Sequence, residues 1–84
     1  MTLSDYKFTN YFMKEIIRKR PYIKNEWCIR IIENPLKIER QEFNRYRFWG
    51  RIKKFDDKIS RVITLEDKKT IHNVFPDRSY KNEN

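Results

Sequence analysis

Cations and aromatic side chains alternate in residues 45–54, RYRFWGRIKK, around the single glycine of the chain. If this segment is a strand, every second side chain points to the same face, which then carries Arg45, Arg47, Trp49, Arg51 and Lys53. Guanidinium groups form paired hydrogen bonds to phosphate, and an indole can stack on a nucleobase. The pattern predicts a nucleic-acid-binding face, with RNA favoured over DNA. The alternative is a solvated charged face with Trp49 packed beneath a loop or a partner.

The positive charge of the chain is concentrated around this segment. The chain of 84 residues contains 20 Lys and Arg against 12 Asp and Glu, a net charge of +8. Residues 37–54 hold seven Lys and Arg against two Glu, and so contribute +5 of that charge. The excess predicts an anionic partner, either nucleic acid or an acidic protein. A membrane surface is not expected, because the apolar stripe of residues 10–20 is needed for the core.

Three further side chains could act on RNA without a metal. His72, the single histidine, could serve as a general acid or base near neutral pH. Arg61 could stabilise charge on a phosphorus-centred transition state. Arg78 follows Pro76 in a tail that could fold over the sheet. His72 and Arg61 also have structural interpretations: His72 could be a buried, hydrogen-bonded imidazole, and Arg61 a salt-bridge partner.

Other kinds of site are disfavoured by what the chain contains. Cys28 is the only cysteine, which excludes an internal disulfide and a Cys-based zinc site and fits a reducing, cytoplasmic setting. A chain with one glycine cannot carry a phosphate-binding glycine loop or a dinucleotide fingerprint. We therefore expect no metal and no cofactor. Residues 1–8 lack the apolar core of a signal peptide, and no run approaches the roughly 18 apolar residues of a membrane span.

The hydropathy pattern predicts one domain over residues 1–84, with a folded core at 6–76 and a C-terminal tail at 77–84. Its first half reads as a short strand at 5–8, a helix capped by Thr9 and ending at about Lys19, and a second helix at 26–33 capped by Asn25. The periodicity then changes from 3.6 to 2. The chain is expected to be α+β, with a short N-terminal strand and two helices packed on an antiparallel meander of three to four strands.

The strands of the meander are expected at 45–53, 58–66 and 69–75, and residues 37–43 are either a further strand or an irregular lead-in. Four-residue loops at 54–57 and 66–69 would sort the side chains into two faces. The face under the helices would hold Tyr46, Phe48, Gly50, Ile52, Ile59, Arg61, Ile63, Leu65, His72 and Val74. The opposite face would hold the basic residues of the first strand with Ser60, Val62, Thr64, Glu66, Ile71, Asn73 and Phe75. Arg61 would then lie opposite Gly50, where the missing side chain leaves room for a guanidinium group.

Several segments carry a resemblance to known proteins. FTNYFMKEIIRKR, CIRIIENP, RYRFWGRI and ISRVITLEDKKTIHNVFP, which together span most of residues 6–76, resemble a family of small bacterial domains related to the BrnT and RelE/ParE toxin superfamily. The best matches are ENP at 33–35, the aromatic-rich strand, and the arginine-bearing ISRVI at 59–63. TLEDKKTIHNVFPDR is also similar to a segment of small cyanobacterial proteins.

The resemblance implies a RelE/ParE/BrnT-like fold and a metal-independent ribonuclease of the toxin–antitoxin type, held in check by an antitoxin protein. Arg61 is the family-like position, whereas the family's helix histidine and the arginine four residues later fall on Tyr11 and Glu15. With Arg61, His72 and Arg78 as catalytic residues, such a nuclease is the first expectation. A non-catalytic nucleic-acid-binding regulatory module is the second, and a protein-interaction domain whose basic face docks an acidic partner is the third.

Overall fold

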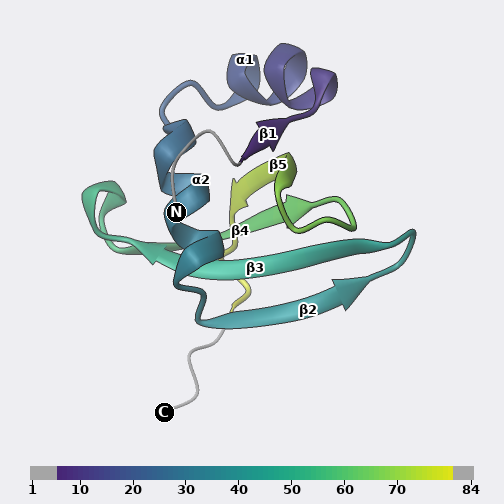
Figure 1. Cartoon of the computed structure of the whole chain (residues 1–84). Helices are drawn as coiled ribbons and strands as arrows, with labels where there is room; N and C mark the ends of the chain where they lie inside the picture. Colours follow the sequence, from purple (N-terminus) through teal and green to yellow (C-terminus); the bar gives the residue numbers. More distant parts are fainter. Residues whose placement is uncertain (1–5, 81–84) are drawn as a thin grey trace.

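The computed structural model describes residues 6–80, so the predictions that fall on residues 1–5 and 81–84 lie outside the described residues. Its centre is a five-stranded mixed sheet in the order β1-β5-β4-β3-β2 (Figure 1). The strands are β1 (Lys7–Phe8), β2 (Lys37–Gln41), β3 (Arg45–Ile52), β4 (Lys58–Thr64) and β5 (Thr70–Pro76). β1 pairs with β5 in parallel, and the other pairs are antiparallel. The α+β class is confirmed, and the segment at 37–43 supplies a strand.

The first helix begins where the sequence predicts. The backbone N–H of Phe12 donates to Thr9 Oγ1 at 3.1 Å, which satisfies a group that the first helical turn leaves free. A π-helical turn η2 (Phe12–Ile16) continues into α1 (Ile17–Lys19), and the Ile17 N–H bonds to the Phe12 carbonyl. Phe12 and Ile16 are buried, whereas Met13 and Ile17, expected in the same stripe, are exposed. The helix buries one row of side chains because it packs on β5 near the edge of the sheet.

Helix α2 (Asn25–Glu33) crosses β3 and β4 (Figure 1). Asn25 is its first residue and not its cap, a shift of one position. A Cβ on Gly50 would lie 2.7 Å from Cγ1 of the buried Ile31, too close for any side chain. The glycine therefore lets α2 approach the sheet. The prediction that Gly50 makes room for Arg61 is wrong, because the residue opposite Gly50 is Ser60.

The connection between β3 and β4 is one residue longer than expected. Ile52 pairs with Lys58, so five residues join the strands. They form a 3₁₀ turn, η3 (Lys53–Phe55), followed by Asp56 and Asp57 in the left-handed region at φ 54° and 55°. An odd connection reverses the faces of the next strand. The prediction for β4 is therefore wrong: Ser60, Val62 and Thr64 point towards the helices, and Ile59, Arg61 and Ile63 point away.

A bulge in β5 changes the sorting once more. Ile63 pairs with Asn73 and Thr64 pairs with Ile71, which leaves His72 as the extra residue. Ile71 is fully buried although it was predicted to point outwards. His72 was predicted on the core face and instead lies half-buried at the bulge. Val74 is buried in the core, as predicted, because the two errors of register cancel at that position.

The hydrophobic core lies between the sheet and the helices. Its sheet residues include Phe48, Ile52, Val62, Ile71 and Val74, and its helix residues include Phe12, Ile16, Cys28, Ile29 and Ile31. The opposite side of the sheet is called the open face here. By the strand pairing it carries Lys37, Glu39 and Gln41 of β2, Arg45, Arg47, Trp49 and Arg51 of β3, Ile59, Arg61 and Ile63 of β4, and Asn73 and Phe75 of β5. Among the described residues, the helices gather on the side of the sheet opposite this face (Figure 1).

Candidate nucleic-acid interface

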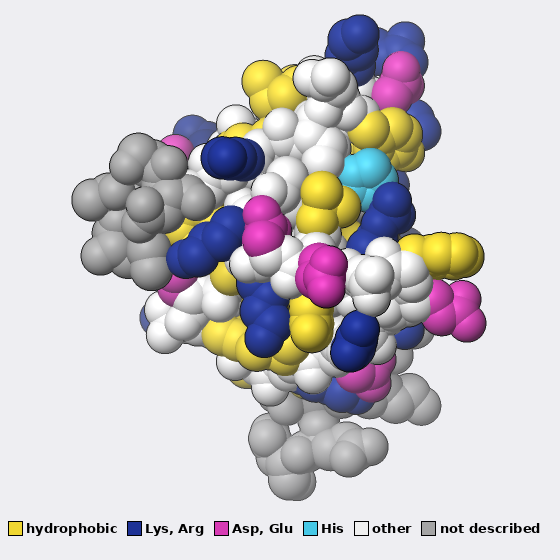
Figure 2. All heavy atoms as spheres, turned by 45° about the vertical axis from the view of Figure 1, so that its right-hand side comes forward, with side chains coloured by type: hydrophobic (Ala, Val, Ile, Leu, Met, Phe, Trp, Pro, Cys, Tyr) yellow, Lys and Arg dark blue, Asp and Glu magenta, His cyan; other side chains and the backbone are white. Residues whose placement is uncertain are grey.

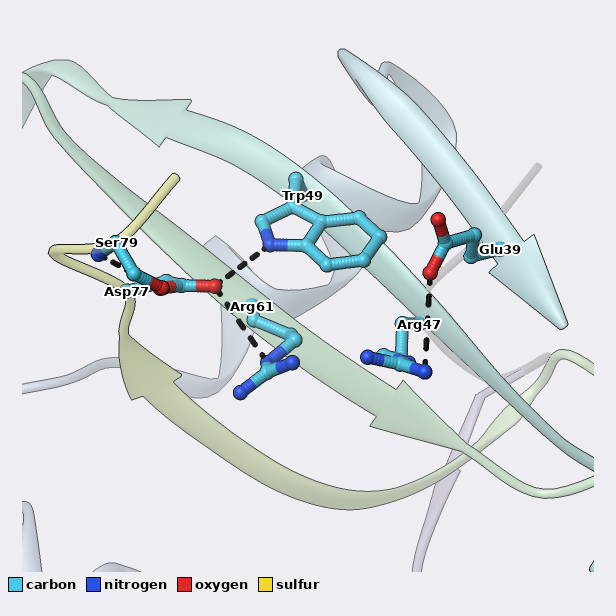
Figure 3. Close-up of polar contacts among 6 residues, drawn as sticks. All are labelled: Glu39, Arg47, Trp49, Arg61, Asp77 and Ser79. Atoms are coloured by element: carbon cyan, nitrogen blue, oxygen red, sulfur yellow. Dashed lines mark hydrogen bonds and ion pairs between the residues drawn. The ribbon is translucent and has the colours of Figure 1, made fainter. Parts of the chain in front are cut away.

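Trp49 is at the centre of the open face, and cations surround its ring. The Nζ of Lys37 lies 5.4 Å from the ring centroid, and the guanidinium carbons of Arg47 and Arg61 lie at 5.8 and 5.7 Å. Figure 3 shows both guanidinium groups and the indole on the same side of the sheet. The indole N–H donates to Asp77 Oδ2 at 2.8 Å. Trp49 is only 5% exposed, so the expectation of an exposed stacking platform is wrong.

The segment after β5 provides the cover of Trp49. The Ser79 N–H and hydroxyl both donate to Asp77 Oδ1, at 3.0 and 2.6 Å, and the ring of Tyr80 lies 5.9 Å from that of Trp49. These bonds from Ser79 and Trp49, with the charge of Arg61, lower the pKa of Asp77 below its ordinary value. Asp77 is therefore a carboxylate at neutral pH. The tail folds over the sheet through Asp77 and Tyr80, as the sequence suggested.

The two central arginines have weak anionic partners. Arg47 Nη2 lies 3.7 Å from Glu39 Oε1, and Arg61 Nε lies 3.7 Å from Asp77 Oδ2 (Figure 3). Both distances exceed that of a hydrogen bond. The Nε of each arginine is buried and has no acceptor within the described residues. The two side chains are 29% and 24% exposed, so their guanidinium groups retain donors that an incoming anion can use.

The remaining residues of the predicted basic face lie apart from this centre. Arg45 is half-buried at the start of β3. Arg51 is exposed near the other end, where Nη1 donates to the Asp57 carbonyl at 3.4 Å. Lys53 was predicted on the same face but lies in η3, where it lines a cavity of about 560 Å³ with Trp27 and Arg30 of α2. Lys53 is thus on the helix side, since the strand ends one residue earlier than predicted.

His72 forms a second polar group at the bulge of β5. Its Nδ1 lies 3.0 Å from Thr9 Oγ1, and its ring stacks on Tyr11 at a centroid distance of 4.9 Å. Burial and the charge of Arg45 lower the pKa of His72, so the imidazole is neutral at pH 7. Figure 2 shows the histidine at the surface beside Lys and Arg side chains. The sequence predicted His72 as a site residue but gave no sign that Thr9 and Tyr11 are its neighbours, because they lie more than 60 residues away in the chain.

The three predicted catalytic residues do not converge on one point. Arg61 pairs across the strands with Phe75, three residues beyond His72. At about 3.3 Å per residue this separates the two positions by roughly 10 Å along the strand. Arg78 is exposed and lines a cavity beyond the end of β5. The side chains also have different neighbours: Arg61 lies over the ring of Phe75, and His72 stacks on Tyr11.

Two other kinds of chemistry find no support among residues 6–80. Burial raises the pKa of the Cys28 thiol to about 12, so this cysteine is not a nucleophile at neutral pH. Within the same range, no group of three or more His, Cys, Asp or Glu side chains could hold a metal ion. No helix in that part of the chain is both long and apolar enough to cross a membrane.

Comparisons with known proteins found no relative of this chain. No family model, no curated protein and no solved structure matches the chain. A function for the chain is therefore inferred from the geometry of the open face.

Proposed function

We propose that the open face binds nucleic acid, and RNA in the first place, through the phosphates of the backbone. The observation that carries this proposal is the state of Arg47 and Arg61. Their guanidinium groups lie side by side around Trp49, partly exposed, with carboxylates no closer than 3.7 Å. A phosphate oxygen offers each guanidinium the close, charge-assisted hydrogen bonds that these carboxylates do not make.

The charge of the open face supports the same ligand. It carries the cations Lys37, Arg45, Arg47, Arg51 and Arg61 against the carboxylate of Glu39, with Asp77 added from the tail. Trp49 holds three of these cations in place by contact with its ring, so they are ordered before a ligand arrives. An ordered cation loses less conformational entropy on binding than a free surface lysine does.

Metal-independent cleavage of the bound RNA, as in a RelE-like toxin, is a second candidate function. It is favoured by His72, whose neutral imidazole could accept a proton from a 2′-hydroxyl beside the charge of Arg45. The separation of His72 from Arg61 and Arg78 favours binding over cleavage. An antitoxin-like acidic protein is the other partner that the same cations would suit.

Fluorescence anisotropy with a short labelled RNA in EDTA tests the proposal. The double variant Arg47→Gln/Arg61→Gln keeps much of the side-chain packing and removes two charges. We expect it to bind at least about tenfold more weakly, with the slope of log affinity against log salt smaller by about 1.4. Lys53→Gln/Lys54→Gln removes the same charge from the helix side and is the matched control, with a much smaller loss.

Two results would contradict this reading. Equal losses in the two double variants would mean that only the net charge of the protein matters. No binding of RNA by the wild-type protein, together with tight binding of an acidic polypeptide, would assign the face to a protein partner. A gel of the same mixtures, with His72→Ala beside the wild type, tests cleavage: RNA that stays intact with the wild type removes the nuclease.

A further inference from the structure

A cavity of about 760 Å³ lies where the open face meets the tail and the β3–β4 connection. Its aromatic lining residues are Tyr22, Phe55 and Phe75, and its cations are Arg20, Lys58 and Arg78. Asp77 is the single anion in the lining, and its carboxylate is already bonded to Trp49 and Ser79. The volume falls within the range of small-molecule sites, and the lining combines flat rings with positive charge.

Phe75 connects the cavity to Arg61 of the open face. Arg61 lies with its guanidinium carbon 4.5 Å from the centroid of Phe75, and Phe75 is one wall of the cavity. Arg20 approaches the same ring at 5.9 Å. A polyanion that lies along Arg47 and Arg61 is thus led to the mouth of the cavity, where three more cations can hold the next phosphates.

Tyr22 is the most accessible of the three aromatic side chains that line the cavity. Two guanidinium groups lie near the Phe75 ring, and Phe55 has Tyr22, Trp27 and the Nζ of Lys58 around it. Tyr22 stacks on Phe55 at 5.5 Å and is still 50% exposed. A planar group that enters the cavity can therefore stack on the outer face of Tyr22.

We propose that this cavity receives an unpaired nucleobase, so that the ligand of the open face is single-stranded RNA and not a duplex. The inference depends on the proposed function, since the phosphates on Arg47 and Arg61 bring the base to the cavity. In a duplex the bases are stacked on one another and paired, and none can reach Tyr22. The stack on Tyr22 adds affinity for any base, because every base has a flat face.

The test compares one labelled RNA, alone and annealed to its complement, by fluorescence anisotropy with the wild-type protein and three variants. We expect the single strand to bind more tightly than the duplex. Tyr22→Ala should weaken single-strand binding by about 5- to 100-fold and leave duplex binding unchanged. Tyr22→Phe keeps the ring and should bind like the wild type. Phe43→Ala, which removes an 86% exposed ring from the β2–β3 turn, should have no effect.

A second readout reports the stack itself, on Tyr22→Ala that still binds the duplex like the wild type. 2-Aminopurine built into the RNA loses fluorescence when it stacks, so the wild-type protein and Tyr22→Phe should quench it and Tyr22→Ala should not. Equal affinity for both forms of the RNA, or unchanged binding and quenching by Tyr22→Ala, would overturn the cavity proposal. If Arg47→Gln/Arg61→Gln still lowers affinity in that case, the binding face stands without the cavity. If neither RNA binds, both proposals fall.

Discussion

Phe48 and Trp49 are adjacent in the chain, and both are buried, but by different means. Phe48 is 2% exposed beneath the helices, within a cluster of apolar side chains. Trp49 is 5% exposed on the open face, where its neighbours include three cations, a carboxylate and Tyr80. Apolar burial of Phe48 stabilises the fold and offers nothing to a ligand. The cations around Trp49 can leave their carboxylate and ring contacts and bind a ligand, which is why the open face is the candidate interface.

The largest expected effect concerns the side of the sheet beneath the helices. Phe48→Ala should lower the free energy of unfolding by about 3–5 kcal/mol, because it removes a large side chain from a packed core and leaves a cavity. Urea denaturation followed by circular dichroism measures this loss. Phe43→Ala is the control on an exposed ring and should change stability by about 0.5 kcal/mol or less. Similar losses in both variants would mean that the core is not where the structure places it.

A smaller effect, a gain in RNA affinity, is expected at Asp77, which lies against the open face. Asp77→Asn removes the carboxylate beside Arg61 and retains an oxygen for the Trp49 N–H. RNA affinity should rise by about fivefold, since one unit charge near a bound phosphate contributes about 1 kcal/mol in water at close range. Glu26→Gln, which removes one negative charge from α2, should raise affinity much less. Weaker binding by Asp77→Asn would show that the tail assists the ligand and does not compete with it.

The smallest effect is the dependence of stability on pH at His72. Because burial and Arg45 lower its pKa in the folded protein, the unfolded chain binds the proton more readily. The contribution of His72 to stability is complete above its ordinary pKa of about 6.5 and is lost as the pH falls through the folded value. Urea denaturation between about pH 7.5 and 5 should therefore show a steeper loss for the wild type than for His72→Gln. Parallel profiles would mean that the imidazole titrates as it does in water.

The alternation of β3 could be read from the sequence because Tyr46, Phe48 and Ile52 are apolar and their neighbours are cations. The strand and helix limits also followed, within one or two residues. The faces of β4 did not follow, because Lys53 has no property that marks it as part of a turn and not of a strand. One residue more in that connection exchanges the two faces of β4. The same connection explains the error at Ile71, which pairs with Thr64 before the bulge, whereas the bulge at His72 returns Val74 to its predicted face.

The sequence allowed the tail to fold over the sheet but gave no sign of which residues would cover Trp49. Asp77 and Ser79 are ordinary turn residues, and only folding brings Asp77 against Trp49, 28 positions earlier in the chain. Similarly, Tyr22 and Phe75 lie more than 50 residues apart and meet at one cavity. The basic character of the face could therefore be predicted, whereas the sequence left open whether its tryptophan is exposed or covered and gave no position for a cavity.

The amino-acid sequence by itself determined the class of the fold, the order of its elements and the positive character of one strand face. These properties depend on periodicity and composition, which act over a few neighbouring residues. The tertiary structure alone decided which face Arg61 and His72 occupy, what covers Trp49 and where the cavity forms. Those properties depend on the parity of turns and on contacts between distant segments, and a single inserted residue or one long-range hydrogen bond changes them.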